Sequence, residues 1–419
     1  MPCLILSGGS IKAHCRFCGT ALKYIFVSLG SSPLSNAYLT LDQLSKKEKT
    51  YPLDVFVCER CFLVQIPEFA APQEIFGDYA YFSSYSDTWL KHAKDYVDKI
   101  TPLFGIDKNS YVVEIASNDG YLLQYFSAKG IPVLGIEPAR NVAEIARQKG
   151  IPTEAVFFGT QIAKKMQAQG KSSDLIIGNN VLAHVPDVND FVAGLKILLK
   201  PGGLVTMEFP HLMNLINNVQ FDTIYHEHFS YFSFLVVNQI FKKHGLAIFD
   251  VEELNTHGGS LRIYAKHDNN ARLKNSAHVL ELEKRELDAG YGSLDFYLNF
   301  KEKVEKARQD IVDFLHKAKK DKKTVVGYGA PAKGNTLLNY CGVNNDLISY
   351  TVDRSPHKQG RYLPGTHIFI DKPERIIQTK PDYVFILPWN IKEEIMQQLS
   401  FIRQWGGKFV IPIPKVTVI

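Results

Sequence analysis

The chain has 419 residues, of which 45% are hydrophobic and 22% charged, and a formal net charge of +5. This length exceeds what one hydrophobic core organises, so we expect two or three domains. The small charge disfavours a nucleic-acid partner, and no apolar run approaches the roughly 18 residues of a membrane helix. We therefore expect a cytoplasmic enzyme, a monomer or weak oligomer, without membrane or nucleic-acid partners. The basic segment 317–323 ends a predicted helix and is better explained as a solvated surface.

Two Cys-x-x-Cys pairs dominate the beginning of the chain. Their members are Cys15, Cys18, Cys58 and Cys61. Two such pairs supply the four thiolates of a tetrahedral zinc ion, and a filled tetrahedron leaves no open position for catalysis. The alternative of two redox motifs is weaker, because neither pair lies at the strand-to-helix turn of a thioredoxin-like unit. We therefore predict a structural zinc domain over residues 1–75, with short strands at Tyr51–Val57 and Phe62–Ile66.

Between residues 76 and 268 strands and helices alternate, which predicts a doubly wound α/β sheet. The expected strands are Tyr111–Ile115, Val133–Ile136, Leu175–Gly178, Gly203–Phe209, Ala247–Glu252 and Ser260–His267. The expected helices are Leu122–Lys129, Val142–Gln148, Gln161–Ala168 and Val188–Leu199. Amphipathic connector helices are expected over 270–320, and a second α/β unit opens at 324, so residues 269–419 form the third predicted domain.

The turn after the first of these strands runs from Glu114 to Gly120 and lacks the G-x-G-x-x-G of a dinucleotide fold. Its polar members are Glu114, Ser117, Asn118 and Asp119. Such oxygen atoms can hold the ammonium group of an amino-acid tail, and Gly120 lets the backbone come close. One strand later, Glu137 can accept both hydroxyls of a ribose. This pattern is typical of S-adenosylmethionine enzymes, with a nicotinamide cofactor as the disfavoured alternative.

Two further polar groups of residues are expected near the cofactor. Asn179, Asn180 and His184 follow the end of a strand, where open α/β sheets bind ligands. The consecutive residues Tyr225, His226, Glu227 and His228 could converge as alternate members of an extended segment. We favour an acid–base cluster, because imidazole titrates near neutral pH; a second metal, a solvated loop and a polar core cluster are the alternatives.

Two other segments are candidates for substrate binding. Tyr79, Tyr81 and Ser83 lie in an aromatic stretch that core packing explains equally well. The loop from Gly327 to Gly334 follows a strand and opens a helix, so its amides form an anion site to which Lys333 adds a charge. The alternatives to binding a diphosphate are a vestigial dinucleotide fold and a purely structural loop.

Taken in order, these motifs resemble one family along almost the whole chain. They are the two cysteine pairs, YAYFSSYS, EIASNDGYLL, GIEP, NNVLAHVPD, YHEHFSYFS, THGGSLRIY and GYGAPAKGNTLLN. The family is that of sugar C-methyltransferases acting on nucleotide-linked keto-deoxysugars, such as those for tetronitrose, mycarose and noviose. The resemblance implies a zinc-binding N-terminal domain, a class I Rossmann-like methyltransferase core and a C-terminal Rossmann-like domain that helps to bind the nucleotide sugar.

The resemblance also implies an activity, which is methylation of a carbon, C3, next to the keto group of a 4-keto-6-deoxyhexose carried by dTDP or GDP. His228 is then the base that forms the enolate. Tyr225, Glu227 and His184 orient the base or position the sugar, and Tyr79 closes over it. In the C-terminal domain Gly329, Lys333 and Asn335 are the expected sugar-nucleotide contacts. Two alternatives are an O- or N-methyltransferase and, in another class, a zinc-ribbon protein that binds nucleic acid.

Overall fold

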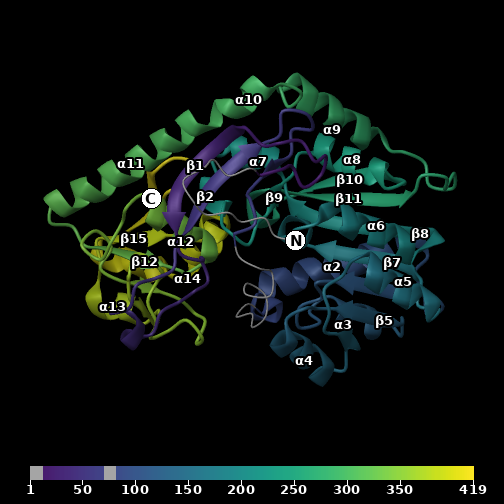
Figure 1. Cartoon of the computed structure of the whole chain (residues 1–419). Helices are drawn as coiled ribbons and strands as arrows, with labels where there is room; N and C mark the ends of the chain where they lie inside the picture. Colours follow the sequence, from purple (N-terminus) through teal and green to yellow (C-terminus); the bar gives the residue numbers. More distant parts are fainter. Residues whose placement is uncertain (1–12, 70–81) are drawn as a thin grey trace.

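The computed structural model describes residues 13–69 and 82–419, which form three β-sheets with helices around them (Figure 1). In the figure the seven-stranded sheet lies to the right and the six-stranded sheet to the left. The four-stranded sheet lies between them, below a long connector helix. No helix of these residues is long and apolar enough to span a bilayer.

The seven-stranded sheet has the order β10-β11-β8-β7-β4-β5-β6. Its strands are β4 (Val112–Ile115), β5 (Val133–Ile136), β6 (Thr153–Glu154), β7 (Ser173–Asn179), β8 (Leu199–Pro210), β10 (Leu246–Leu254) and β11 (Ser260–His267). All neighbours are parallel except β11, which pairs antiparallel with both β8 and β10. The predicted class I Rossmann-like core is therefore confirmed, and all six predicted strands of this region are present.

Helices cover both faces of this sheet, which is why β4 is buried along its whole length. Val112 packs in a cluster with Trp89 and Phe126, whereas its neighbour Val113 packs with Met166 and Phe191 on the other face. The covering helices are α2 (Asp87–Phe104), α3 (Leu123–Ser127), α4 (Arg140–Gln148), α5 (Thr160–Ala168), α6 (Val188–Leu198) and α8 (Phe234–Lys243). Alternate residues of one strand thus belong to two cores.

The four-stranded sheet consists of β1 (Tyr24–Ser32), β2 (Tyr51–Val57), β3 (Val64–Gln65) and β9 (Ser230–Tyr231). Its last strand comes from the middle of the chain and pairs with β3 through Val64 and Gln65. The predicted unit 1–75 therefore lacks one strand of the sheet that it begins. The sequence did not indicate this, because a two-residue strand carries no periodic pattern.

The C-terminal unit has a six-stranded sheet in the order β14-β13-β12-β15-β16-β17, parallel except for β17. Its strands are β12 (Val325–Tyr328), β13 (Thr351–Val352), β14 (Ile370–Asp371), β15 (Tyr383–Ile386), β16 (Lys408–Ile411) and β17 (Thr417–Val418), and its helices are α12 (Ala332–Tyr340), α13 (Arg375–Thr379) and α14 (Lys392–Gln398). The connectors are α9 (Ala277–Asp288), α10 (Leu294–Leu298) and α11 (Phe300–Lys320).

Buried polar contacts join these units. Glu286 of α9 is fully buried and accepts hydrogen bonds from the backbone N–H groups of Phe234 and Leu235, at the start of α8, at 2.7 and 2.8 Å. Its other contact is His211 Nε2 at 2.6 Å, just before helix α7 (Leu212–Asn217). Asp222 is also buried and accepts a hydrogen bond from Trp389 Nε1 of the C-terminal unit at 2.6 Å.

Candidate active site

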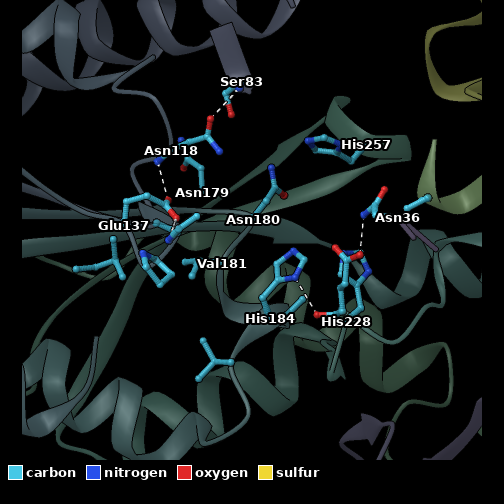
Figure 2. A pocket seen from close by; sticks show the side chains of 18 of the residues that line it. Asn36, Ser83, Asn118, Glu137, Asn179, Asn180, Val181, His184, His228 and His257 are labelled. Atoms are coloured by element: carbon cyan, nitrogen blue, oxygen red, sulfur yellow. Dashed lines mark hydrogen bonds between the residues drawn. The ribbon is translucent and has the colours of Figure 1, made fainter. Parts of the chain in front are cut away.

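A cavity of about 420 Å³ lies where the three units meet. Asn36 and Tyr38 reach it from the N-terminal unit, and Lys333 and Lys358 from the C-terminal unit. The remaining wall consists of loops at the carboxyl ends of β4, β5, β7 and β8 together with the segment around residue 225. Figure 2 shows the polar side chains of this wall converging on one space. Ligands of open α/β sheets bind at this edge.

Glu137, directly after β5, organises one end of the cavity. Its carboxylate accepts hydrogen bonds from the backbone N–H groups of Asn118 at 3.0 Å and Ala139 at 2.9 Å. Only 5% of the residue is exposed, and burial raises the pKa of its carboxyl to about 7. Because each carboxylate oxygen can accept more than one hydrogen bond, Glu137 can still bind two neighbouring hydroxyls of a ligand.

Asn118 and Asn179 lie beside Glu137. Asn118 adopts a left-handed backbone, with φ of 50°, and its Oδ1 accepts a hydrogen bond from the Ser83 N–H at 2.8 Å. Asn179 donates from Nδ2 to the Tyr121 hydroxyl at 3.4 Å. Ser83, one of the predicted substrate residues, thus lines the cavity next to the cofactor turn.

Four predicted cofactor residues belong to this turn or to the strand end before it but do not line the cavity, namely Glu114, Ser117, Asp119 and Gly120. Asp119 forms an ion pair with Lys149 at 2.8 Å, and the Ser117 side chain faces Gly135 of β5. Burial raises the pKa of the Glu114 carboxyl well above its usual value. Gly120 has φ of +78°, and an added Cβ would lie 2.9 Å from Ile151 Cγ1, so the turn requires glycine here.

Asn180 and His184 occupy the middle of the cavity wall. The backbone of Asn180 is left-handed, with φ of 53°, and its Oδ1 is buried without a hydrogen-bond partner among the described residues. His184 donates from Nδ1 to the Glu227 carbonyl at 2.8 Å, so the neutral ring carries its lone pair on Nε2. Burial lowers the pKa of His184 to about 4, which keeps the ring neutral.

The segment from Tyr225 to His228 is a turn, and the predicted extended alternation is wrong. The backbone N–H of His228 donates to the Tyr225 carbonyl at 2.9 Å, and this brings residues three positions apart together. His228 Nδ1 donates to the Thr223 carbonyl at 2.9 Å, so its Nε2 accepts from the Tyr225 hydroxyl at 2.8 Å. His226 points away, within 3.1 Å of the Pro52 carbonyl oxygen.

Burial also lowers the pKa of His228 well below its usual value, and His184 lowers it further. The rings of His184 and His228 are edge to face, with centroids 4.7 Å apart. Glu227 completes the cluster and accepts a hydrogen bond from Asn36 Nδ2 of the N-terminal unit at 2.6 Å. The arrangement therefore holds a neutral imidazole with a basic nitrogen next to a phenol.

The C-terminal unit contributes two lysines. Lys333 Nζ hydrogen-bonds Asn390 Oδ1 and lies 4.4 Å from the centroid of the Trp389 ring; burial lowers its pKa to about 8. Lys358 Nζ donates to the Ala330 carbonyl at 2.8 Å, as does the Tyr38 hydroxyl at 2.6 Å. Both lysines line this side of the cavity, and Lys358 Nζ also lies 3.7 Å from the Asp353 carboxylate.

Two predicted residues of this unit have other surroundings. Gly329 and Asn335 do not line the cavity, and Asn335 Nδ2 donates to the Ser35 carbonyl at 2.5 Å, which joins α12 to the N-terminal unit. Tyr79 and Tyr81 lie outside the described residues. Sequence reasoning missed Asn36, Tyr38, Trp89, His257 and Lys358, which line the cavity. His257 lies in the motif THGGSLRIY, the one sequence feature that could have indicated it.

The four paired cysteines meet beneath β3. Their sulfur atoms all lie within 4.8 Å of one another, and the Cys15–Cys61 and Cys18–Cys58 distances are both 3.5 Å. Four ligands at about 2.3 Å around a tetrahedral zinc ion would be roughly 3.8 Å apart, so the geometry fits. Each pair flanks a tight turn, and Gln65 Nε2 of β3 donates to Cys15 Sγ at 3.2 Å.

The cavity residues also fit S-adenosylmethionine. Glu137 suits ribose hydroxyls, Val156 and Phe158 provide an apolar surface for a flat base, and Asn180 Oδ1 has no hydrogen-bond partner in the part of the chain that the structure describes. Fold and site together define a S-adenosylmethionine-dependent methyltransferase with an N-terminal zinc-binding domain. Three family models match the chain: "Putative zinc binding domain" over residues 15–76, "Methyltransferase domain" over 89–251 and "C-methyltransferase C-terminal domain" over 255–414.

Among known proteins, C-methyltransferase NovU of Streptomyces niveus is 36% identical over 97% of this chain and 96% of its own length. The chain belongs to this C-methyltransferase family. A ubiquinone biosynthesis O-methyltransferase of Bartonella quintana is 27% identical over 23% of this chain and 40% of its own length. A solved S-adenosylmethionine-dependent methyltransferase of Clostridium acetobutylicum is 12% identical, with a TM-score of 0.34, and covers 42% of this chain and 92% of its own.

Proposed function

We propose that the chain methylates C3 of a nucleotide-linked 4-keto-6-deoxyhexose, next to the keto group. The observation that carries this proposal is the half-buried pair of Tyr225 and His228, joined at 2.8 Å in a cavity that also fits the methyl donor. A carbon next to a ketone is weakly acidic, so a base must remove its proton. Transfer to an oxygen or nitrogen atom does not need an enolate-forming site of this kind.

His228 is the proposed base. Its Nε2 is unprotonated, because Nδ1–H donates to the Thr223 carbonyl and burial lowers the pKa. The proton of the substrate carbon passes to this nitrogen, directly or through the Tyr225 hydroxyl, and leaves an enolate. The cofactor supplies an electrophilic methyl group on its sulfonium. His184 and Glu227 hold the cluster in shape through the hydrogen bond from His184 Nδ1 to the Glu227 carbonyl.

The proposed seat of the nucleotide diphosphate is the side of the cavity formed by Lys333, Lys358 and Tyr38. Two ammonium groups can supply several hydrogen bonds to phosphate oxygens, and Lys333 reaches the cavity from the first turn of α12. dTDP is the first carrier to test and GDP the second. The two loop residues that do not line the cavity, Gly329 and Asn335, would then support this seat without touching the ligand.

The test uses isotope exchange as well as methyl transfer. Wild-type protein with S-adenosylhomocysteine and a nucleotide-linked 4-keto-6-deoxyhexose in D₂O should exchange the hydrogen at C3, because the enolate forms without capture. H228N should retain ligand binding and lose both exchange and methylation by about 10²–10⁴-fold. If H228N methylates normally and H184N is inactive, the base is His184. If the wild type shows neither reaction with a panel of dTDP- and GDP-linked sugars, the proposed function is wrong.

A further inference from the structure

A third histidine of this cavity, His257, lies outside the cluster of His184 and His228. It lies in the 3-10 turn η5 (Thr256–Gly258), between β10 and β11. Its Nε2 is buried and has no hydrogen-bond partner among the described residues. In Figure 2 it lies above His184 and His228, with Asn180 beside it. A buried polar nitrogen in a cavity wall is satisfied when a ligand binds there.

The backbone of His257 is held in an unfavourable conformation by its surroundings. Its φ and ψ of 52° and 24° are left-handed, a region that is uncommon for residues other than glycine. Thr256 Oγ1 donates to the buried carboxylate of Glu208 at 2.7 Å, and the Gly258 carbonyl accepts from Gln220 Nε2 at 2.7 Å. Neighbouring contacts therefore stabilise the strained residue, as is common where a side chain is positioned for a ligand.

The backbone at Gly258 is closely packed against the C-terminal unit. An added Cβ on Gly258 would lie 2.7 Å from Trp389 Cη2 of the C-terminal unit. The ring of His257 packs against Trp89 of α2, edge to face, with centroids 5.1 Å apart. Contacts from the C-terminal unit and from α2 thus fix the direction of the imidazole.

The charge state of the ring is set by its surroundings. Burial lowers the pKa of His257 to about 4, and Lys333 and His92 lower it further, against the opposing effect of Glu208. His257 in turn lowers the pKa of both His184 and His228, so the three rings lie within electrostatic reach of one another. All three histidines also line the same cavity, so a substrate bound there faces both the base and His257.

Building on the proposed function, we propose that His257 is a further catalytic residue, whose Nε2–H donates a hydrogen bond to the keto oxygen of the substrate. When the base removes the proton from the adjacent carbon, the C–H electron pair forms the C=C bond. The carbonyl π pair then moves onto the oxygen, where the negative charge develops. A neutral, fixed imidazole N–H stabilises such a charge without giving up its proton.

The proposal is tested with H257N and H257Q. Asparagine tolerates the left-handed backbone but its side chain is too short to reach the position of Nε2, whereas glutamine restores a donor at similar reach. H257N should lower the rate of C3 hydrogen exchange and kcat by about 10²–10³-fold, with little change in KM or in calorimetric binding of S-adenosylhomocysteine. H257Q should recover part of this loss, and the exposed His278→Asn should behave as wild type.

Two results would overturn the proposal. One is H257N exchanging hydrogen at the wild-type rate, and the other is a raised KM with unchanged kcat, which would assign His257 to binding. The wild type serves as the reference for the proposed function, because exchange must be present there for this comparison to be made. If H257N does not fold, H257Q carries the test, and a wild-type exchange rate in H257A together with H257Q would equally overturn it.

Discussion

The cysteine site and the cavity differ in how their polar atoms are satisfied. In the cysteine site four sulfur atoms from residues 15–61 face one another, and one ion satisfies them all. In the cavity, side chains from three units face a common space, and Asn180 Oδ1 and His257 Nε2 have no partner among the described residues. A closed set of ligands indicates a structural role, whereas unsatisfied polar atoms in a cavity wall can bind a ligand that enters the cavity.

The largest effect is expected at the closed site. Cys58→Ser should abolish binding of about one zinc per chain and unfold the N-terminal unit, because structural zinc contributes on the order of 10 kcal/mol to small domains. Zinc analysis and thermal unfolding measure this. Cys341→Ala, a buried cysteine of the C-terminal unit, should keep its zinc. A zinc-free C58S protein with an unchanged melting temperature would show that the cysteine site has no structural role.

A smaller loss is expected where a polar contact stabilises the scaffold around the cavity. Glu286→Ala leaves the Phe234 and Leu235 N–H groups and His211 Nε2 buried without their acceptor. Removing one partner of such a buried contact costs about 3–5 kcal/mol, to be measured by urea unfolding. Glu281→Ala, on the exposed side of the same helix, is the matched control. Equal stability of the two variants would contradict this account of α9.

At the cofactor end of the cavity, Glu137→Ala should weaken binding of S-adenosylmethionine by about 1.5–3 kcal/mol, the range for hydrogen bonds to a charged group. Isothermal titration calorimetry measures the loss. Glu154→Ala removes a carboxylate at the next strand end that does not line the cavity, so its affinity should not change. An unchanged affinity in the Glu137 variant would place the ribose elsewhere.

The smallest effect concerns pH. Lys333 has a pKa of about 8 because of burial, so it is charged below that pH and neutral above it. Binding of a nucleotide diphosphate should therefore weaken as the pH rises, by roughly tenfold, or about 1.4 kcal/mol, at pH 9. Lys333→Arg keeps its charge and should show a flat profile over the same range. Identical profiles would exclude Lys333 from the phosphate site.

The closed site was predictable because all its ligands belong to two short motifs. The doubly wound sheet and its six expected strands were predictable from their local pattern as well, since buried parallel strands such as Val133–Ile136 are continuous apolar runs. The cavity was predictable where its residues follow a strand end, as for Glu137 and Asn180, or belong to a polar cluster, as for Tyr225 and His228. Asn36 and Lys358 are single polar residues without a pattern, and only long-range packing brings them to the wall.

Turns limited the prediction in a second way. The same residues can form either an extended segment or a tight turn. The extended interpretation places Tyr225 and His228 on opposite faces, whereas the turn in the structure brings the Tyr225 hydroxyl within 2.8 Å of His228 Nε2. His257 was missed because its left-handed backbone depends on contacts with Glu208, Gln220 and Trp389, all distant in sequence. Local sequence propensity predicts neither the turn that joins Tyr225 and His228 nor the left-handed backbone of His257.

The short strand β9 has a consequence for how the protein folds during synthesis. The edge of β3 that carries Val64 and Gln65 pairs with Ser230 and Tyr231, which the ribosome adds about 165 residues later. At about 5–20 residues per second, β3 waits roughly 8–30 seconds for its neighbour. During that time the edge of β3 is available to other nascent chains, and the zinc site holds the turn between β2 and β3 in place.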